Sequence, residues 1–318
     1  MKRRSLSTCA LAASLFSVGV VLPTVVIAAD AQQPSKKAES QSKSKTSQKG
    51  ETQSKVSQSV QPEIDKQTAD VAAEKRKKLL AEAMAALAES KKALKALEEN
   101  KPEKALAALA EVTGKLEVIV AREPDLALAP VDVQVVTEDI VASPETIKTT
   151  IEKAKEYLDD GEIQKARPLV ASLSSEIRYR IINIPLATYP DAIKSVTPLI
   201  DDGKIDEAKA ALQAALNTLV VTTAEVVELP KLRTERLLKH AQELAEKQDR
   251  SSTENTELAD TLHAARKELE RGELLGYGNK EAYKSLYEEL GELEKKSSGG
   301  KSGKGWFDKI KKQLSELF

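Results

Sequence analysis

Residues 158–166 read LDDGEIQKA, and residues 200–208 repeat the pattern as IDDGKIDEA. In each copy a helical run meets two acids and a glycine, Gly161 or Gly203, and glycine readily adopts the left-handed backbone that ends a helix. The aliphatic residue two places later, Ile163 or Ile205, is expected to fold back over the turn. The alanine five places after the glycine leaves room for two helices to approach closely. The repeat therefore predicts two antiparallel helical hairpins.

Two looser copies of the pattern extend this prediction. Residues 97–105 read LEENKPEKA, with Asn100 in the position of the glycine and Pro102 at the favoured first position of a helix. Residues 269–282 read LERGELLGYGNKEA, with Gly272 in that position and an insertion after it. The spacing between the four copies is uneven, whereas tetratricopeptide arrays keep a period of about 34 residues. The copies therefore predict a bundle of hairpins with turns at Asn100, Gly161, Gly203 and Gly272.

The N-terminal 66 residues are expected to lie outside the folded body. Residues 1–28 have a basic start (MKRR) and an apolar run ending in small residues, which is typical of a cleaved signal peptide; an uncleaved anchor is the alternative. The mature chain then has no cysteine, because Cys9 is the only one. The periplasm is the expected destination, with release to the medium as the alternative. Residues 29–66, rich in Ser, Gln and Lys, are expected to form a disordered tether.

The body, residues 67–296, has apolar residues at helical spacing over most of its length. The expected helices include 66–97, 102–121, 143–160, 204–228 and 230–248. Alternating valines after residue 130 favour an extended segment, and the run IRYRIINIPL fits either the end of a helix or a strand. The predicted fold class is mainly α, with antiparallel helical hairpins packed as a bundle and at most a short β or extended segment near 131–141.

The C-terminus combines a linker with a strongly amphipathic segment. Residues 297–305 (SSGGKSGKG) are expected to be a flexible linker, and residues 306–318 (WFDKIKKQLSELF) a tail helix. This profile is typical of a helix that lies on a membrane surface, docks in a partner's groove or docks on its own body. One side of the helix gathers the apolar residues Trp306, Phe307, Ile310, Leu314, Leu317 and Phe318.

No motif in the chain indicates catalysis, a metal or a cofactor. The two histidines, His240 and His263, are not arranged as a zinc motif, and no nucleophile elbow or phosphate-binding loop is present. The acid pairs of the repeated pattern lack the oxygens of a calcium loop and are expected to be helix ends. Basic and acidic residues nearly balance, at 49 and 50, with the basic ends flanking an acidic body, so nucleic acid is not an expected partner. No catalytic residue, no metal site and no cofactor is predicted.

Three segments resemble the YfdX family of exported bacterial proteins. They read LALAPVDVQVVTEDIV (126–141), TIEKAKEYLDDGEIQKARPLVA (150–171) and IPLATYPDAIKSVTPLIDDGKIDEAKAALQAALNTL (184–219), in that order. The resemblance implies a secreted, α-helical and oligomeric protein with roles in stress or acid tolerance, chaperone-like behaviour or small-molecule binding. It brings no catalytic motif. The long tether and the tail after residue 296 depart from the family pattern.

Together these observations predict an exported, non-catalytic helical interaction protein with a chaperone-like or stress-response role. The alternative is a small-molecule binding protein with a pocket between helical hairpins. The expected partners are protein clients or further copies of the chain, with membrane-surface contact through the tail as a further expectation.

Overall fold

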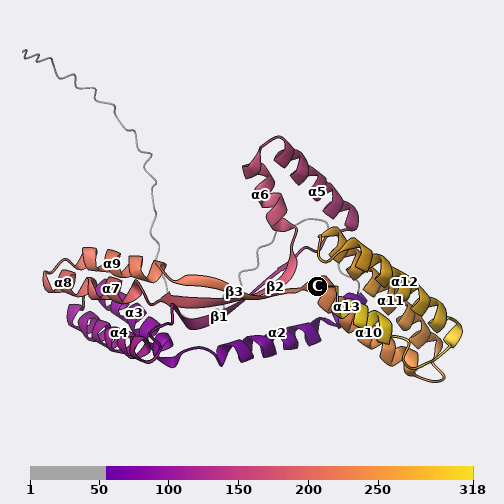
Figure 1. Ribbon diagram of the computed structural model, residues 1–318, viewed down its shortest axis with the longest axis horizontal. Helices are drawn as coiled ribbons and strands as arrows, with labels where there is room; N and C mark the ends of the chain where they lie inside the picture. The colour runs from indigo at the N-terminus through magenta and orange to yellow at the C-terminus, as the bar shows by residue number, and fades with distance from the viewer. Residues whose placement is uncertain (1–54, 318) are drawn as a thin grey trace, which may run out of the picture. The chain divides into compact units, whose positions relative to one another are not determined.

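The computed structural model describes residues 55–317. The predicted signal peptide, most of the predicted tether and Phe318 lie outside the described residues. The elements, drawn in Figure 1, are α1 (Lys55–Ser59), α2 (Gln61–Arg76), α3 (Ala81–Glu98), α4 (Pro102–Arg122), β1 (Leu128–Asp139), α5 (Pro144–Asp159), α6 (Ile163–Ser172), β2 (Ser175–Pro185), α7 (Tyr189–Lys194), α8 (Val196–Asp201), α9 (Ile205–Asn217), β3 (Val220–Glu228), α10 (Leu229–Glu246), α11 (Ser252–Leu274), α12 (Lys280–Ser297), a 3-10 turn (Ser298–Gly300) and α13 (Asp308–Ser315).

The predicted mainly α fold class is confirmed, and successive helices pair as hairpins. Helices α3 and α4 pack together, as do α5 and α6, α8 and α9, and α10 and α11. Asn100 closes α3 with a φ of 55°, and Gly161 and Gly203 close α5 and α8 with a φ of 72° each. These left-handed residues reverse the chain where the repeated pattern predicts a turn.

The sheet is larger than the sequence predicts. It has three antiparallel strands in the order β1-β2-β3, with Val135 opposite Tyr179 and Ile177 opposite Val227. The ambiguous IRYRIINIPL run lies mostly in the central strand, β2. The predicted helix 204–228 is wrong, because α9 ends at Asn217 and the segment VVTTAEVVE forms β3. Valine and threonine are stiff at their branched Cβ and pack well on a pleated surface, which favours the strand once β2 is available as a partner.

The tether prediction is wrong for its last twelve residues, 55–66, which lie in α1 and at the start of α2. Val56, Val60 and Ile64 recur at fourfold spacing in this otherwise polar segment, and Val60 and Ile64 are buried in the core. The predicted helix 66–97 is also two helices, because α2 ends at Arg76 and α3 begins at Ala81.

Gly272 lies inside α11 and is buried, so the predicted turn at this position is wrong. The chain reverses after Leu275 instead, where Gly276 and Gly278 have φ values of 81° and 73°. A β-carbon on Gly272 would lie 2.6 Å from Tyr283 Oη and 3.3 Å from Pro230 Cβ. The glycine is therefore required for close packing of neighbouring elements rather than for a backbone turn.

We expect Gly272→Ala to lower the free energy of unfolding by about 1–3 kcal/mol, because the buried Tyr283 ring must shift to admit the new methyl group. Gly114→Ala in α4 is the matched control, since no atom lies within 4 Å of its added Cβ. That substitution is expected to stabilise the protein by about 0.5–1 kcal/mol through helix propensity. Urea unfolding of both variants measures the two effects, and equal stabilisation by both would contradict the close packing at Gly272.

Buried apolar residues form two core clusters. The first is built from α1, α2, the β2 residues Ile177 and Tyr179, and the C-terminal helices α10–α13. The second is built from α3, α4, the N-terminal part of β1, the end of β2 and α7–α9. Neither cluster includes a residue of α5 or α6. The α5–α6 hairpin therefore contributes to neither core cluster.

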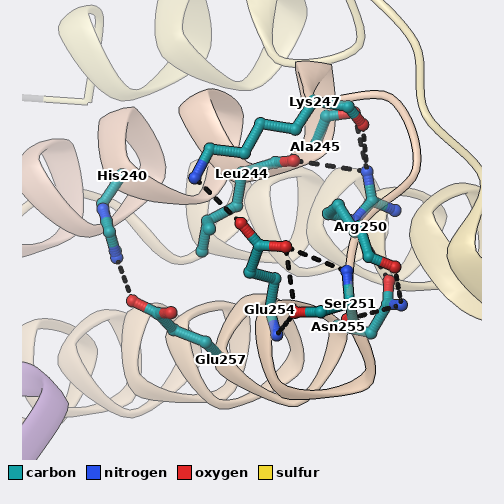
Figure 2. Close-up of polar contacts among 9 residues, drawn as sticks. All are labelled: His240, Leu244, Ala245, Lys247, Arg250, Ser251, Glu254, Asn255 and Glu257. Atoms are coloured by element: carbon teal, nitrogen blue, oxygen red, sulfur yellow. Dashed lines mark hydrogen bonds and ion pairs between the residues drawn. The ribbon is translucent and has the colours of Figure 1, made fainter.

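Arg250 fixes the predicted linker, residues 297–305, onto the end of α10. Its guanidinium is buried and satisfies carbonyl groups that the end of a helix leaves without partners (Figure 2). The linker is thus held by hydrogen bonds rather than free. The acceptors are the carbonyls of Leu244, Ala245 and Lys247 at 3.2, 3.0 and 3.2 Å, the carbonyls of Ser297 and Lys301 at 3.5 and 2.6 Å, and Asn255 Oδ1 at 3.0 Å.

The turn from α10 into α11 is closed by a capping box. The Ser251 hydroxyl accepts from Glu254 N at 3.2 Å, and the Glu254 carboxylate accepts from Ser251 N at 2.9 Å (Figure 2). The hydrogen bond from Ser251 N, together with those from Lys247 and the Ser251 hydroxyl, lowers the pKa of Glu254 to about 2. His240 on α10 contacts Glu257 on α11 at 2.9 Å, so this histidine serves as a surface link between the two helices.

Candidate functional site

The α5–α6 hairpin carries an exposed apolar surface. Its two helices pack against each other, and Ile147, Ala154 and Ala166 are their buried apolar residues. Leu158, Ile163 and Val170 remain 49%, 61% and 51% exposed. Leu158 lies beyond the buried Ile147 and Ala154 stripe of α5, and Ile163 and Val170 flank Ala166 on α6. We call Leu158, Ile163 and Val170 the hairpin face.

The second copy of the repeated pattern shows the same face in a covered state. The residues that match Leu158, Ile163 and Val170 are Ile200, Ile205 and Leu212 in α8 and α9. Ile200 is 5% exposed and Leu212 is fully buried, while Ile205 packs at the edge of the core. The same apolar positions are thus covered in one hairpin and open in the other.

The difference lies in what each hairpin packs against. Helix α9 packs on α3, and α8 packs on α4, so the α3–α4 pair forms a layer over the α8–α9 face. The main neighbour of the α5–α6 hairpin outside itself is α11, which it contacts through α5. The hairpin face has no such covering layer within the described chain.

A buried ionic cluster joins the end of β1 to α10 and α11. Arg233 Nη2 donates to Asp139 Oδ2 at 2.7 Å and Nη1 donates to Asp139 Oδ1 at 3.1 Å, in a forked arrangement. Glu268 Oε2 lies 3.9 Å from Arg233 Nη1 and accepts from Arg271 Nη1 at 3.2 Å. The Ser175 hydroxyl donates to Asp139 at 2.7 Å. The cluster therefore ties the sheet to the C-terminal helices.

The two carboxylates of this cluster have opposite pKa shifts. Burial alone would raise the pKa of Asp139, but the hydrogen bonds and charge of Arg233, together with Ser175, outweigh it and lower the pKa. Burial raises the pKa of Glu268 against the opposing charges of Arg271 and Arg233. Glu268 therefore binds a proton at a higher pH in the folded chain than in the unfolded chain.

This shift has a pH signature. The folded chain binds more protons than the unfolded chain above pH 4.5, the ordinary pKa of a glutamate, so the contribution of Glu268 to stability decreases as the pH rises through this window. Glu268→Gln removes this dependence. We expect the difference in unfolding free energy between the variant and the parent, measured by urea unfolding, to shift in favour of the variant as the pH rises above 4.5. Glu288→Gln, at an exposed position of α12, is the control; a difference that stays constant with pH would contradict the raised pKa.

A cleft of about 500 Å³ lies between α2, the sheet and α10. Its lining includes apolar residues and four charged side chains, of which Asp139 and Arg233 pair with each other. Glu268 does not line the cleft. The cleft lies beside the sheet rather than between helical hairpins, where the alternative prediction expected a pocket. No group of three or more His, Cys, Asp or Glu residues that could hold a metal occurs within residues 55–317.

The tail packs on the chain's own helices, which is one of the alternatives open from the sequence. Phe307, Ile310, Leu314 and Leu317 are buried in the first core cluster, where α13 contacts α10 and α12. Trp306 packs at the edge of this cluster. A membrane or partner contact through these residues would require the tail to leave this position, and it stays a prediction. No helix within the described part of the chain is long and apolar enough to span a bilayer.

The hairpin face is a functional candidate that the sequence did not single out. Ile163 was expected to fold back over its turn, yet it is the most exposed of the three residues. The paired acids beside it form the helix end, as the pattern predicts. Both copies of the repeat carry apolar residues at the matching positions, so the sequence does indicate an apolar face on each hairpin. The repeat does not indicate which of the two faces is covered by other helices.

The fold defines a class of protein made of helical hairpins around a three-stranded antiparallel sheet. Residues 86–225, which run from α3 into β3, match the model of the YfdX protein family. This match confirms the family resemblance and is narrower than the predicted YfdX-like domain, residues 67–296. Among solved structures, YfdX of Salmonella Typhi is similar with 15% identity and a TM-score of 0.32, covering 48% of this chain and 93% of that chain. No curated protein matches the chain.

Proposed function

We propose that this chain is an exported, non-catalytic interaction protein that binds apolar segments of other proteins through the hairpin face, in a chaperone-like or stress-response role. The observation that supports the proposal is the exposure of Leu158, Ile163 and Val170 at positions whose counterparts in α8 and α9 are covered. Single exposed apolar residues are ordinary on protein surfaces, whereas grouped ones often mark a binding site.

The surroundings of the hairpin face suit a reversible contact. Charged residues of both signs flank it along α5 and α6, which keeps the hairpin soluble when the face is free. The hairpin lies outside both core clusters, so a partner can cover the face without disturbing either core. Export to the periplasm, with cleavage after residue 28, is part of the same proposal and rests on the sequence of the N-terminus.

Light scattering of a heat-stressed client protein tests the proposal. The mature chain, residues 29–318, is compared at equal mass with an inert protein and with the triple variant Leu158→Gln/Ile163→Gln/Val170→Gln. A matched control changes three other exposed apolar residues, Met84→Gln/Val118→Gln/Val120→Gln, which are 46%, 39% and 42% exposed. We expect the parent and the control to suppress scattering and the hairpin triple variant to lose most of this effect.

Two outcomes would reject the proposal. Absence of suppression by the parent at any pH from 7 to 5 would contradict a chaperone-like role. Equal suppression by the hairpin triple variant would show that another surface binds the client. Circular dichroism of each variant establishes that the helices are retained, which is expected because all six substituted side chains are exposed.

The alternative function, small-molecule binding, would use the cleft between α2, the sheet and α10. Arg76 and Asp65 line this cleft together with the Asp139–Arg233 pair. Asp139 and Arg233 are hydrogen-bonded to each other, so fewer of the charged side chains that line the cleft are available to bind a ligand. Small-molecule binding therefore stays a prediction with weaker support than the hairpin face.

A further inference from the structure

We infer that the free edge of β3 is a second binding surface, which takes an extended, uncharged peptide segment as an added strand of the sheet. The peptide that fits this edge carries valine, isoleucine or threonine at alternate positions and contains no proline. The inference goes beyond the proposed function, because it uses neither the hairpin face nor a helical contact and holds whether or not that face binds clients.

Strand β3 has an unpaired edge. It pairs with β2 on one side and is the last strand of the three-stranded sheet on the other. In an antiparallel ladder, alternate residues of such a strand direct their N–H and C=O groups away from the sheet. Within residues 55–317, the backbone groups of 220–227 form hydrogen bonds to no element other than β2. The edge therefore presents a row of donors and acceptors that another extended backbone can pair with.

The side chains of β3 also favour strand pairing. Residues 219–224 read LVVTTA and contain no charged residue, no proline and no glycine. Segments of this composition readily pair as strands. No residue of β3 is buried, and Val221 and Val226 are 53% and 40% exposed, whereas no residue of β2 is exposed. A peptide paired with this edge would place its own side chains beside valine and threonine on both faces of the sheet.

The opposite edge of the sheet, formed by β1, is protected. Pro130 has no N–H to donate, and its carbonyl accepts from Leu80 N at 3.1 Å. The register shifts between Pro130 and Asp132, and Asp132 Oδ1 accepts from the N–H of Val133 at 2.8 Å. Helices α2 and α3 also pack on β1. Proline, bulges, charged residues and covering helices all keep an edge strand from pairing, so the two edges of this sheet differ in their availability.

A bulge in β3 defines where the peptide pairs. Ala224 has no opposite residue in β2, whereas Thr223 and Glu225 on either side of it do. A bulge bends the strand and interrupts regular pairing. Beyond the bulge, Glu225 forms an ion pair with Lys75 of α2 at 2.6 Å. The regular and uncharged run is therefore 220–223, and a contact of this length is expected to be reversible.

Fluorescence anisotropy and hydrogen exchange of the mature chain test the inference. The probe is a short labelled peptide of alternating valine and threonine between one lysine and one glutamate. It is N-methylated at alternate residues, so that one edge can pair and the peptide cannot stack on itself. We expect the probe to bind and to slow amide exchange in the fragment that contains residues 220–223, but not in β1. The same peptide with every amide methylated keeps its side chains, has no N–H to donate and should not bind.

Two matched variants locate the contact. Val221→Lys/Thr223→Lys places two charges on the edge of β3, and Val135→Lys/Thr137→Lys places the same charges at exposed positions of β1. We expect the first variant to weaken probe binding at least about tenfold and the second to change it by less than about twofold. General repulsion does not account for such a difference, because the probe has no net charge. Circular dichroism establishes that both variants are folded.

Four results would overturn the inference: no binding of the probe, equal binding of the fully methylated peptide, protection of β1 instead of residues 220–223, or equal losses in the two lysine variants. It would also fail if Val221→Lys/Thr223→Lys dissociated an oligomer of a parent that does not bind the probe, because a second copy would then cover the edge. The Leu158→Gln/Ile163→Gln/Val170→Gln variant should bind the probe as the parent does. This result separates the β3 edge from the hairpin face, whereas loss of probe binding in that variant would contradict a second surface.

Discussion

Replacing Phe307 by alanine is expected to lower the free energy of unfolding by about 3–5 kcal/mol, because the phenyl ring is fully buried and its loss leaves a cavity. The ring belongs to the core cluster that the tail shares with α10 and α12. The loss should appear as a lower urea midpoint with an unchanged slope, since the rest of the chain still unfolds as one unit.

Val170→Ala is the matched control for this prediction. Val170 is exposed on α6, so its truncation should change the stability by no more than about 0.5 kcal/mol. A loss below about 1 kcal/mol for Phe307→Ala would indicate that the tail is not docked in solution. That result would favour the alternative in which the tail contacts a membrane or a partner.

Replacing Arg233 by methionine is expected to lower the free energy of unfolding by about 3–5 kcal/mol, because it removes the buried cation that faces the buried carboxylate of Glu268 and the partly buried carboxylate of Asp139. Arg233 binds Asp139 through both terminal nitrogens and lies 3.9 Å from Glu268. Without Arg233, fewer favourable contacts stabilise the ionised carboxylate of Asp139 in its partly buried position. Asp139 is then expected to bind a proton more readily. The destabilisation should therefore be largest at neutral pH and smaller at about pH 4, measured by urea unfolding.

The triple variant Arg233→Met/Asp139→Asn/Glu268→Gln is the control for charge burial. Removing all three charges together should recover most of the stability lost in Arg233→Met, since both carboxylates that face Arg233 are then neutral and the remaining cation, Arg271, is only partly buried. If the triple variant is as unstable as the single variant, the packing of the arginine stem rather than its charge would account for the loss.

The hairpin turns could be predicted because they depend on local chemistry. Gly161, Gly203 and Asn100 each hold a left-handed backbone that few other residues adopt at low cost. Gly272 shares the pattern but not the role, because the insertion that follows it moves the turn to Gly276 and Gly278. The local pattern alone does not show that Tyr283 packs against Gly272.

Strand β3 was missed because its partner is remote in the sequence. The run VVTTAEVVE follows a helix with apolar residues that also fit a helical period, and only pairing with β2 selects the strand. Helix α1 and the first turn of α2 were missed for a related reason. Their few apolar residues, including Val60 and Ile64, become informative only once the C-terminal helices provide a surface to pack against.

The exposure of the hairpin face could not be predicted from the repeat. Leu158 and Ile200 occupy the same place in two copies of one sequence pattern, yet one is exposed and the other buried. Burial depends on whether α3 and α4 reach the hairpin, which is a property of the whole fold. The amphipathic tail illustrates the same limit, because its apolar side was evident while its docking site was not.

Site-specific photo-crosslinking tests the central claim most directly, namely that the hairpin face binds other proteins. The mature chain, which has no cysteine after residue 28, receives a single cysteine at Ile163 or at the adjacent Gln164 and is labelled with a benzophenone maleimide. Illumination with a heat-stressed client should give crosslinks from position 163 and few from position 164, because successive helical residues point about 100° apart. Equal yields from both positions, or none from either, would contradict binding through this face.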